Sequence, residues 1–309
     1  MTHPRERLDR DDAAEWERCA RRGDFASAWQ ASDRILQRHR AAPDFSRPRH
    51  EQSVWQGEPV ADRRVLVRCY HGLGDTIQFI RFVPRLAMIA REISVWAQPS
   101  LIPLLRPVRG IDRLLPLHDG PPDADYDVDV EVMELPFVLR ATLDTIPREI
   151  PYLSVAPCDL PGRRPRIGIA WRVSNWEHQR SIPFRALRPL LDIEGITWCS
   201  LQQGRRPDES HAALHDISDG DLHDAARRVK GLDLLITADS MPAHLAGALG
   251  VPVWTLLLER ADWRWMEGRA DSPWYPTMRL FRQGHEGGWP NLVDRVRAEL
   301  QHAAGTALQ

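Results

Sequence analysis

Strand-like segments alternate with helix-like patterns along most of the chain. Runs that are either apolar or strictly alternating occur at 65–69, 93–97, 113–117, 126–133, 166–171, 196–201, 234–238 and 251–258. Helix-like patterns lie between or after them, at 75–90, 100–106, 135–142, 183–191, 221–230, 241–249 and 291–303. Short strands that alternate with helices are typical of parallel sheets built from βα units. The pattern therefore predicts an α/β fold with two doubly wound, Rossmann-like domains facing a cleft.

The start of the chain predicts a short helical hairpin. Two helix-like stretches flank Gly23, which breaks the pattern between them. The positions of Gly23, Phe25, Ala28 and Pro43 resemble those of one tetratricopeptide repeat. A single repeat cannot bury its own apolar face. The hairpin is therefore either a brace packed on the body of the protein or a docking site for a partner protein.

Proline-rich segments suggest where the domains join. Residues 43–62 are rich in proline and charge, and five prolines lie between residues 143 and 165. We therefore predict a helical hairpin, a linker, two Rossmann-like domains and a C-terminal helix, in that order, over residues 1–45, 46–62, 63–157, 158–290 and 291–309.

Composition narrows the class of protein. A formal net charge of -2 argues against a nucleic-acid partner bound through bulk electrostatics. The four cysteines form no Cys-x-x-Cys pair, so neither a zinc site nor a disulfide framework is expected. Residues 1–12 are charged and lack the apolar core of a secretory signal, and no apolar run approaches the ~20 residues of a membrane span. We expect a cytoplasmic protein with no metal site and no membrane span.

The most informative segment is a glycine-rich turn that ends at Asp75. It follows the strand at 65–69 and contains Gly72 and Gly74. The glycines allow a tight turn and a close approach to a ligand, and ligands of open α/β sheets bind at the carboxyl ends of the strands. Asp75 is thus a candidate for chemistry, or else a carboxylate that only stabilises the start of a helix.

A second strand-to-helix turn contains Asp239, Ser240, Met241 and His244. Ser240 is a good helix cap, and Pro242 suits the first helical turn. The N–H groups at such a helix start, together with the helix dipole, favour a diphosphate. The alternative is a well-capped structural helix.

Two further segments carry candidate ligand contacts. In the polar loop at 171–181, Arg172, His178 and Arg180 are suited to neutralising a leaving phosphate, although a solvated loop is the competing interpretation. Trp263 and Trp265 lie in an aromatic loop, where they either stack on a base or cover a core.

Several segments, taken in order along residues 14–300, resemble glycosyltransferase family 9. This is the heptosyltransferase-like group with the GT-B fold, and the branch in question often carries tetratricopeptide repeats. The matching segments are Trp55-Gln-Gly-Glu-Pro59, Gly72-Leu-Gly-Asp-Thr-Ile-Gln-Phe79, Arg180-Ser-Ile-Pro183, Asp239-Ser-Met-Pro-Ala-His-Leu-Ala-Gly-Ala-Leu-Gly250, and the aromatic stretch from Asp262 to Arg282.

The resemblance implies an inverting, metal-independent transferase that uses a nucleotide-diphosphate sugar, possibly ADP-heptose, and no cofactor. Asp75 matches the family's candidate base, and Arg180 a basic position near the donor phosphates. The donor is expected to contact Gly72, Gly74, Arg172, His178, Gln202, Asp239, Ser240, Met241 and His244. The first domain would bind the acceptor and the second the nucleotide sugar, with the last helix bracing the first domain.

Two rival functions stay open, and the substrates are undefined. The loop after Trp171 and the arginine at position 180 depart from the family's pattern, which leaves the donor sugar and the acceptor (a glycan, a lipid-linked molecule or a protein) undefined. One rival is a nucleotide-sugar epimerase or hydrolase on the same fold. The other is a catalytically degenerate module that binds a nucleotide sugar or a partner.

Overall fold

The chain divides into two compact units. The computed structural model describes residues 4–41, 54–173 and 178–306. The first unit comprises residues 1–149 and 262–268, and the second comprises residues 150–261 and 269–309. A short stretch of the second half of the sequence thus belongs to the first unit. Part of the predicted linker and of the 171–181 loop lies outside the described residues.

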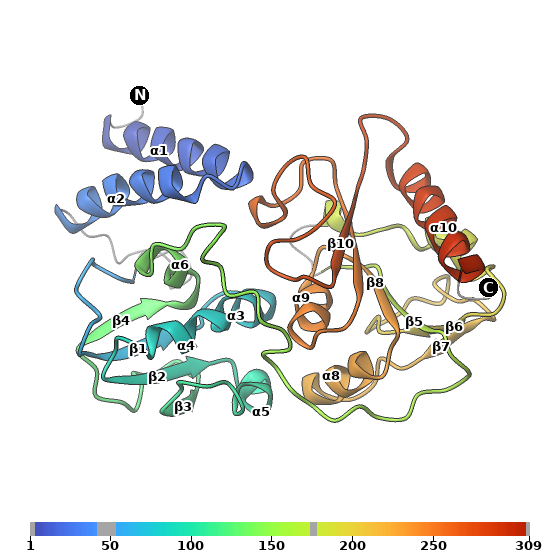
Figure 1. The fold of residues 1–309 in the computed structure, drawn as a ribbon, viewed down its shortest axis with the longest axis horizontal. Helices are drawn as coiled ribbons and strands as arrows, with labels where there is room; N and C mark the ends of the chain where they lie inside the picture. The colour runs from blue at the N-terminus through green and yellow to red at the C-terminus, as the bar shows by residue number, and fades with distance from the viewer. Residues whose placement is uncertain (1–3, 42–53, 174–177, 307–309) are drawn as a thin grey trace. The chain divides into compact units, whose positions relative to one another are not determined.

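The first unit is built on a four-stranded parallel sheet with the order β3-β2-β1-β4 (Figure 1). The strands are β1 (Arg64–Arg68), β2 (Glu92–Ala97), β3 (Arg113–Pro116) and β4 (Val128–Glu131). Because β2 and β3 extend to one side of β1 and β4 lies on the other, the topological switch point falls between β1 and β4. The carboxyl ends of these two strands are where a ligand is expected.

Short helices connect these strands. They are α3 (Leu73–Phe79), η2 (Ile80–Phe82), α4 (Val83–Leu86), η3 (Pro99–Leu101), α5 (Ile102–Leu105), η4 (Val132–Glu134) and α6 (Leu135–Val138). The single helix predicted over 75–90 is divided into α3, η2 and α4. Pro84 in the first turn of α4 supplies no N–H for a continuous helix.

Two long helices precede the first sheet, α1 (Pro4–Arg21) and α2 (Phe25–Ala41), and they lie side by side in Figure 1. Gly23 has a φ of 75° in the turn between them, a conformation that favours glycine. Buried Trp29 stacks on Phe25, and its Nε1 donates a 2.6 Å hydrogen bond to the carbonyl of Ala141. The apolar face of the hairpin is thus used in packing within the first unit. Its relation to a tetratricopeptide repeat stays a prediction.

The second unit has a six-stranded parallel sheet with the order β10-β9-β8-β5-β6-β7. The strands are β5 (Arg166–Ala170), β6 (Thr197–Ser200), β7 (Leu214–Asp216), β8 (Leu234–Ala238), β9 (Val253–Leu257) and β10 (Met278–Arg282). The switch point lies between β5 and β8. The pattern did not indicate β7, which has three residues, or β10, which lies in the predicted aromatic loop.

Helices complete the second unit: η5 (His178–Arg180), α7 (Phe184–Leu191), α8 (Leu222–Lys230), α9 (Met241–Ala248) and α10 (Gly288–Thr306). We predicted that the last helix braces the first domain. Within the second unit α10, drawn in red in Figure 1, packs on α7 and β10, and its bracing of the first domain stays a prediction. Its buried residues Leu292, Val293, Val296 and Leu300 join the core beneath that sheet, so its apolar stripe is taken up there.

Parallel sheets of the predicted kind are thus present in both units, and the cleft between the two domains stays a prediction. Among the helices within the described residues, none has the length and apolar character that crossing a bilayer requires.

Candidate functional site

Asp75 lies at the switch point of the first sheet, where β1 leads through a glycine turn into α3. It occupies the third position of α3, and its Oδ2 accepts a 3.0 Å hydrogen bond from the backbone N–H of Gly72. A Cβ atom on Gly72 would lie 3.2 Å from Oδ2, tighter than an ordinary contact, so glycine suits this closed turn. The local structure thus brings Gly72, Gly74 and Asp75 to the carboxyl edge of β1, as the sequence pattern indicates.

The second oxygen of Asp75 faces a cation that sequence reasoning missed. Oδ1 forms an ion pair with Nη2 of Arg264, from the short helix η6 (Trp263–Trp265). Arg264 also pairs with Asp262 at 2.9 Å and lies over the rings of Phe79 and Trp263. Arg264 lies 189 positions from Asp75 in sequence, so no local pattern could indicate this pair. Arg264 does lie in the aromatic stretch that carries the resemblance.

The aromatic residues of that stretch are used in packing. Trp263 makes an edge contact with Trp16, with ring centroids 5.2 Å apart, and stacks on Phe79 at 6.2 Å. Trp265 is fully buried. Of the two interpretations of these tryptophans, core covering is the one that the described contacts support.

His71 and Glu131 form a second pair at the same edge. Nδ1 of His71 lies 3.0 Å from Oε1 of Glu131, at the end of β4, and Glu131 is 2% exposed. Burial by itself would lower the pKa of His71, but the Glu131 carboxylate, with a further contribution from Asp75, raises it above the usual value. The sequence pattern indicated neither residue as part of a site. The available signal was a histidine directly before the glycine turn.

At the switch point of the second sheet, Asp239 follows β8 and precedes α9. Asp239 is buried, and its Oδ2 lies 3.2 Å from Nη1 of Arg180, a residue of η5 whose side chain is 25% exposed. Ser240 is the N-cap of α9, but its hydroxyl donates to the carbonyl of Ala238 and does not cap the helix. Met241 is the first helical residue. Arg180, Asp239, Ser240 and Met241 are therefore brought together at one helix start.

His244 lies deeper in α9. It is buried, and its Nδ1 is 3.0 Å from the hydroxyl of Tyr275. Tyr275 in turn packs on Gly247, where a Cβ would approach the ring to 2.3 Å. Trp274 and Tyr275 are both buried. The described contact of His244 is thus with the interior of the unit.

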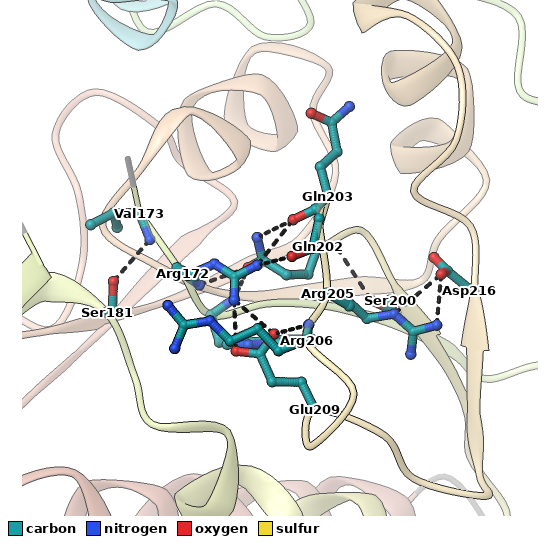
Figure 2. Close-up of polar contacts among 12 residues, drawn as sticks. Arg172, Val173, Ser181, Ser200, Gln202, Gln203, Arg205, Arg206, Glu209 and Asp216 are labelled. Atoms are coloured by element: carbon teal, nitrogen blue, oxygen red, sulfur yellow. Dashed lines mark hydrogen bonds and ion pairs between the residues drawn. The ribbon is translucent and has the colours of Figure 1, made fainter. Parts of the chain in front are cut away.

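Arg172 and Gln202 support the loops that follow β5 and β6 (Figure 2). Oε1 of Gln202 accepts hydrogen bonds from the backbone N–H groups of Trp171 (3.1 Å) and Arg172 (2.7 Å). Nη1 of Arg172 lies 2.7 Å from both carboxylate oxygens of Glu209, and Nη2 donates to the carbonyls of Gln203 (3.2 Å) and Gly204. The guanidinium of Arg172 is therefore engaged within the protein.

Glu209 completes this arrangement. It is 7% exposed and accepts a 2.9 Å hydrogen bond from the N–H of Arg206. Burial opposes its ionisation, but that hydrogen bond and the Arg172 guanidinium hold its pKa below the usual range.

His178, another predicted donor contact, is exposed at the start of η5. Among the predicted donor contacts at this sheet, four cluster at the start of α9, whereas Arg172 and Gln202 have structural partners; the four are Arg180, Asp239, Ser240 and Met241.

Comparison with known proteins identifies the fold. No protein-family model matches the chain. The family 9 glycosyltransferase from Veillonella parvula matches with a TM-score of 0.54 at 13% identity, over 73% of this chain and 87% of that one. E. coli ADP-heptose lps heptosyltransferase II matches with a TM-score of 0.53 at 16% identity, over 80% and 100% of the two chains. E. coli heptosyltransferase WaaC, solved with ADP-2-deoxy-2-fluoro heptose, matches with a TM-score of 0.50 at 12% identity, over 76% and 99%. The chain therefore shares the fold of the family 9 heptosyltransferases.

One curated relative is similar in sequence. Protein FlbA from Caulobacter vibrioides is 23% identical over 293 residues, which cover 82% of this chain. The chain spans about half the length of FlbA, since the match covers 48% of that protein.

Proposed function

We propose that the chain is an inverting, metal-independent glycosyltransferase of family 9 that moves a sugar from a nucleotide-diphosphate sugar to an acceptor hydroxyl. The observation that carries the proposal is the helix start in the second unit beside which a guanidinium lies. There, buried Asp239 holds Arg180 beside the first residues of α9, at the switch point of the sheet. A helix start and a guanidinium together suit a diphosphate.

The donor would place its diphosphate at this helix start. The backbone N–H groups of Ser240 and Met241 are the donors that a helix start offers to an anion. Arg180 and the helix dipole would stabilise the negative charge that the diphosphate gains as it leaves, which is the work that a metal does in other transferases. ADP-heptose is the first donor to test, because the WaaC structure of the same fold holds an ADP-heptose analogue.

The acceptor would be activated at the first sheet. In the proposed step, Asp75 draws the proton from the acceptor hydroxyl while that oxygen forms a bond to the anomeric carbon. The bond between the anomeric carbon and the diphosphate oxygen breaks, and its electron pair leaves with the nucleoside diphosphate. Attack from the face opposite the leaving group inverts the anomeric configuration. We also propose that the acceptor is a glycan, a lipid-linked molecule or a protein, that the chain acts in the cytoplasm, and that a partner protein docks on the hairpin.

A second candidate is a nucleotide-sugar-binding module without catalysis. The observation that favours it is the ion pair between Arg264 and Asp75, because the guanidinium occupies the oxygen Oδ1 that an acceptor hydroxyl needs. Arg172 supports it as well, because that side chain is engaged by Glu209 and two carbonyls.

The variant Asp75→Ala separates the two candidates. In the transferase, this variant abolishes sugar transfer and leaves donor affinity nearly unchanged, because Asp75 serves the acceptor. The assay is product formation by mass spectrometry with calorimetric donor affinity measured in parallel, and exposed Asp144→Ala is the matched control. Near-wild-type turnover of Asp75→Ala would refute the assignment of the base. Donor binding without transfer by the wild type, across glycan, lipid-linked and protein acceptors, would favour the binding module.

A further inference from the structure

The pair of His71 and Glu131 is a titratable group that the proposed mechanism does not use. It lies at the switch point of the first sheet, and the N–H that bonds Oδ2 of Asp75 belongs to Gly72, the residue after His71. The side chain of His71 is 28% exposed, whereas that of Glu131 is 2% exposed. The edge therefore holds an imidazole that reaches solvent, and a buried carboxylate behind it.

Glu131 is held in a single position by the backbone. Its Oε2 accepts a 2.6 Å hydrogen bond from the N–H of Met133, and its Oε1 accepts one of 3.3 Å from the N–H of Tyr70. A carboxylate fixed in this way, with Oε1 3.0 Å from Nδ1, favours the tautomer that carries its proton on Nδ1, so that Nε2 is the basic nitrogen of the neutral ring. The arrangement also stabilises the imidazolium that forms when Nε2 takes a proton.

Charged groups from three elements act on this imidazole. Glu131 at the end of β4 and Asp75 in α3 raise the pKa of His71, and Arg264 in η6 opposes them. The pKa of Cys69, the residue after β1, is raised by burial and by the charge of Glu131, so the thiol stays neutral. The carboxylates prevail, so the pKa of His71 lies above its ordinary value.

We propose that His71, oriented by Glu131, receives the proton that Asp75 draws from the acceptor hydroxyl. The role rests on the proposed transferase function. The proton moves from the hydroxyl to the Asp75 carboxylate and on to Nε2 of His71, by a direct hydrogen bond or one bridging water. Asp75 returns to its ionised form, and the imidazolium releases the proton to solvent. His71 thus acts through Asp75, and the role of Glu131 is to position His71. Neither His71 nor Glu131 contacts the sugar.

The test is the pH dependence of transfer by the wild type, His71→Gln and Glu131→Gln. Because the neutral imidazole accepts the proton, wild-type kcat falls as the pH drops through the pKa of His71, above the ordinary value of ~6.5. His71→Gln lacks this acid limb and has a kcat lower by roughly 10²-fold, the size of a typical acid–base contribution. Glu131→Gln shifts the limb to lower pH. Donor affinity is unchanged in both variants, and exposed His215→Gln is the matched control.

A nuclear magnetic resonance titration covers the case in which Glu131→Gln does not fold. The His71 signal, identified by its absence in His71→Gln, should titrate in the wild type at the same pH as the acid limb of kcat. Transfer by His71→Gln at near-wild-type kcat with the acid limb intact would overturn the inference and leave the transferase proposal standing. A wild type that binds donors but transfers no sugar would overturn both.

Discussion

Arg172 is the residue at which sequence reasoning and structure differ most sharply in role, and its substitution measures which role is right. The pattern predicts a donor contact, whereas the structure pairs Nη1 with both oxygens of Glu209 at 2.7 Å. We predict that Arg172→Met, which keeps an apolar stem of similar length, destabilises the second unit and leaves donor affinity almost unchanged.

The loss of unfolding free energy in Arg172→Met follows from the carboxylate of Glu209, which is left without its partner. Removal of one partner from a buried ion pair costs about 3–5 kcal/mol. Glu209 keeps its hydrogen bond from Arg206, and the Arg172 side chain is 21% exposed, so solvent reduces the loss. We therefore expect about 2–3 kcal/mol, which for a unit of this size lowers the Tm by roughly 5–10 °C.

The assay is urea unfolding of a double-mutant cycle with Glu209→Gln, which removes the charge. Arg172→Met should cost less in the Glu209→Gln background, because no buried charge is then left unpaired. Since the pKa of Glu209 is lowered in the folded state, the stabilisation is present above its ordinary pKa and is lost as the pH falls through the folded value, so the effect shrinks in acid. Unchanged unfolding free energy together with a tenfold loss of donor affinity would refute this reasoning.

Two other predictions concern Asp239, at the start of α9, and Glu134, at the end of η4. Asp239→Ala should weaken donor binding about tenfold, or ~1.4 kcal/mol, because Arg180 loses the carboxylate that holds it. Calorimetry measures the donor affinity, with exposed Asp294→Ala as the control. Unaltered affinity of Asp239→Ala would show that Asp239 has no part in donor binding. Burial raises the pKa of Glu134 to about 8, so its contribution to stability is full below the ordinary pKa near 4.5 and is lost as the pH rises through 8. The unfolding free energy of the wild type should therefore fall between pH 5 and pH 9 by more than that of Glu134→Gln, and equal slopes would contradict the assignment.

Much of the fold was predictable because its strands and helices carry strong local signals. The buried run at 234–238, the Asp-Ser-Met-Pro helix start and the glycine at 250 each point to one local structure, and β8 and α9 are found there. The strands β7 and β10 were missed for different reasons. Residues 214–216 are too few to show a period, and 278–282 lie among aromatic residues that resemble a loop.

The candidate site was predictable where its residues are neighbours in sequence. Gly72 and Asp75 are three positions apart, and Asp239 directly precedes Ser240 and Met241, so local patterns indicated them. Three contacts, those of Asp75 with Arg264, His71 with Glu131 and Arg172 with Glu209, are made only by tertiary structure, because the partners lie 37 to 189 positions apart in sequence. The role of Arg172 could not be read from its loop because its partner, Glu209, follows a different strand.

The most direct test of the account is a calorimetric titration of the purified protein with ADP-, UDP-, GDP- and dTDP-sugars without added metal. We predict saturable binding of one nucleotide class, undiminished by a chelator and weakened in Asp239→Ala. A well-folded protein that binds none of the four classes would contradict the proposal that this chain uses a nucleotide-sugar donor.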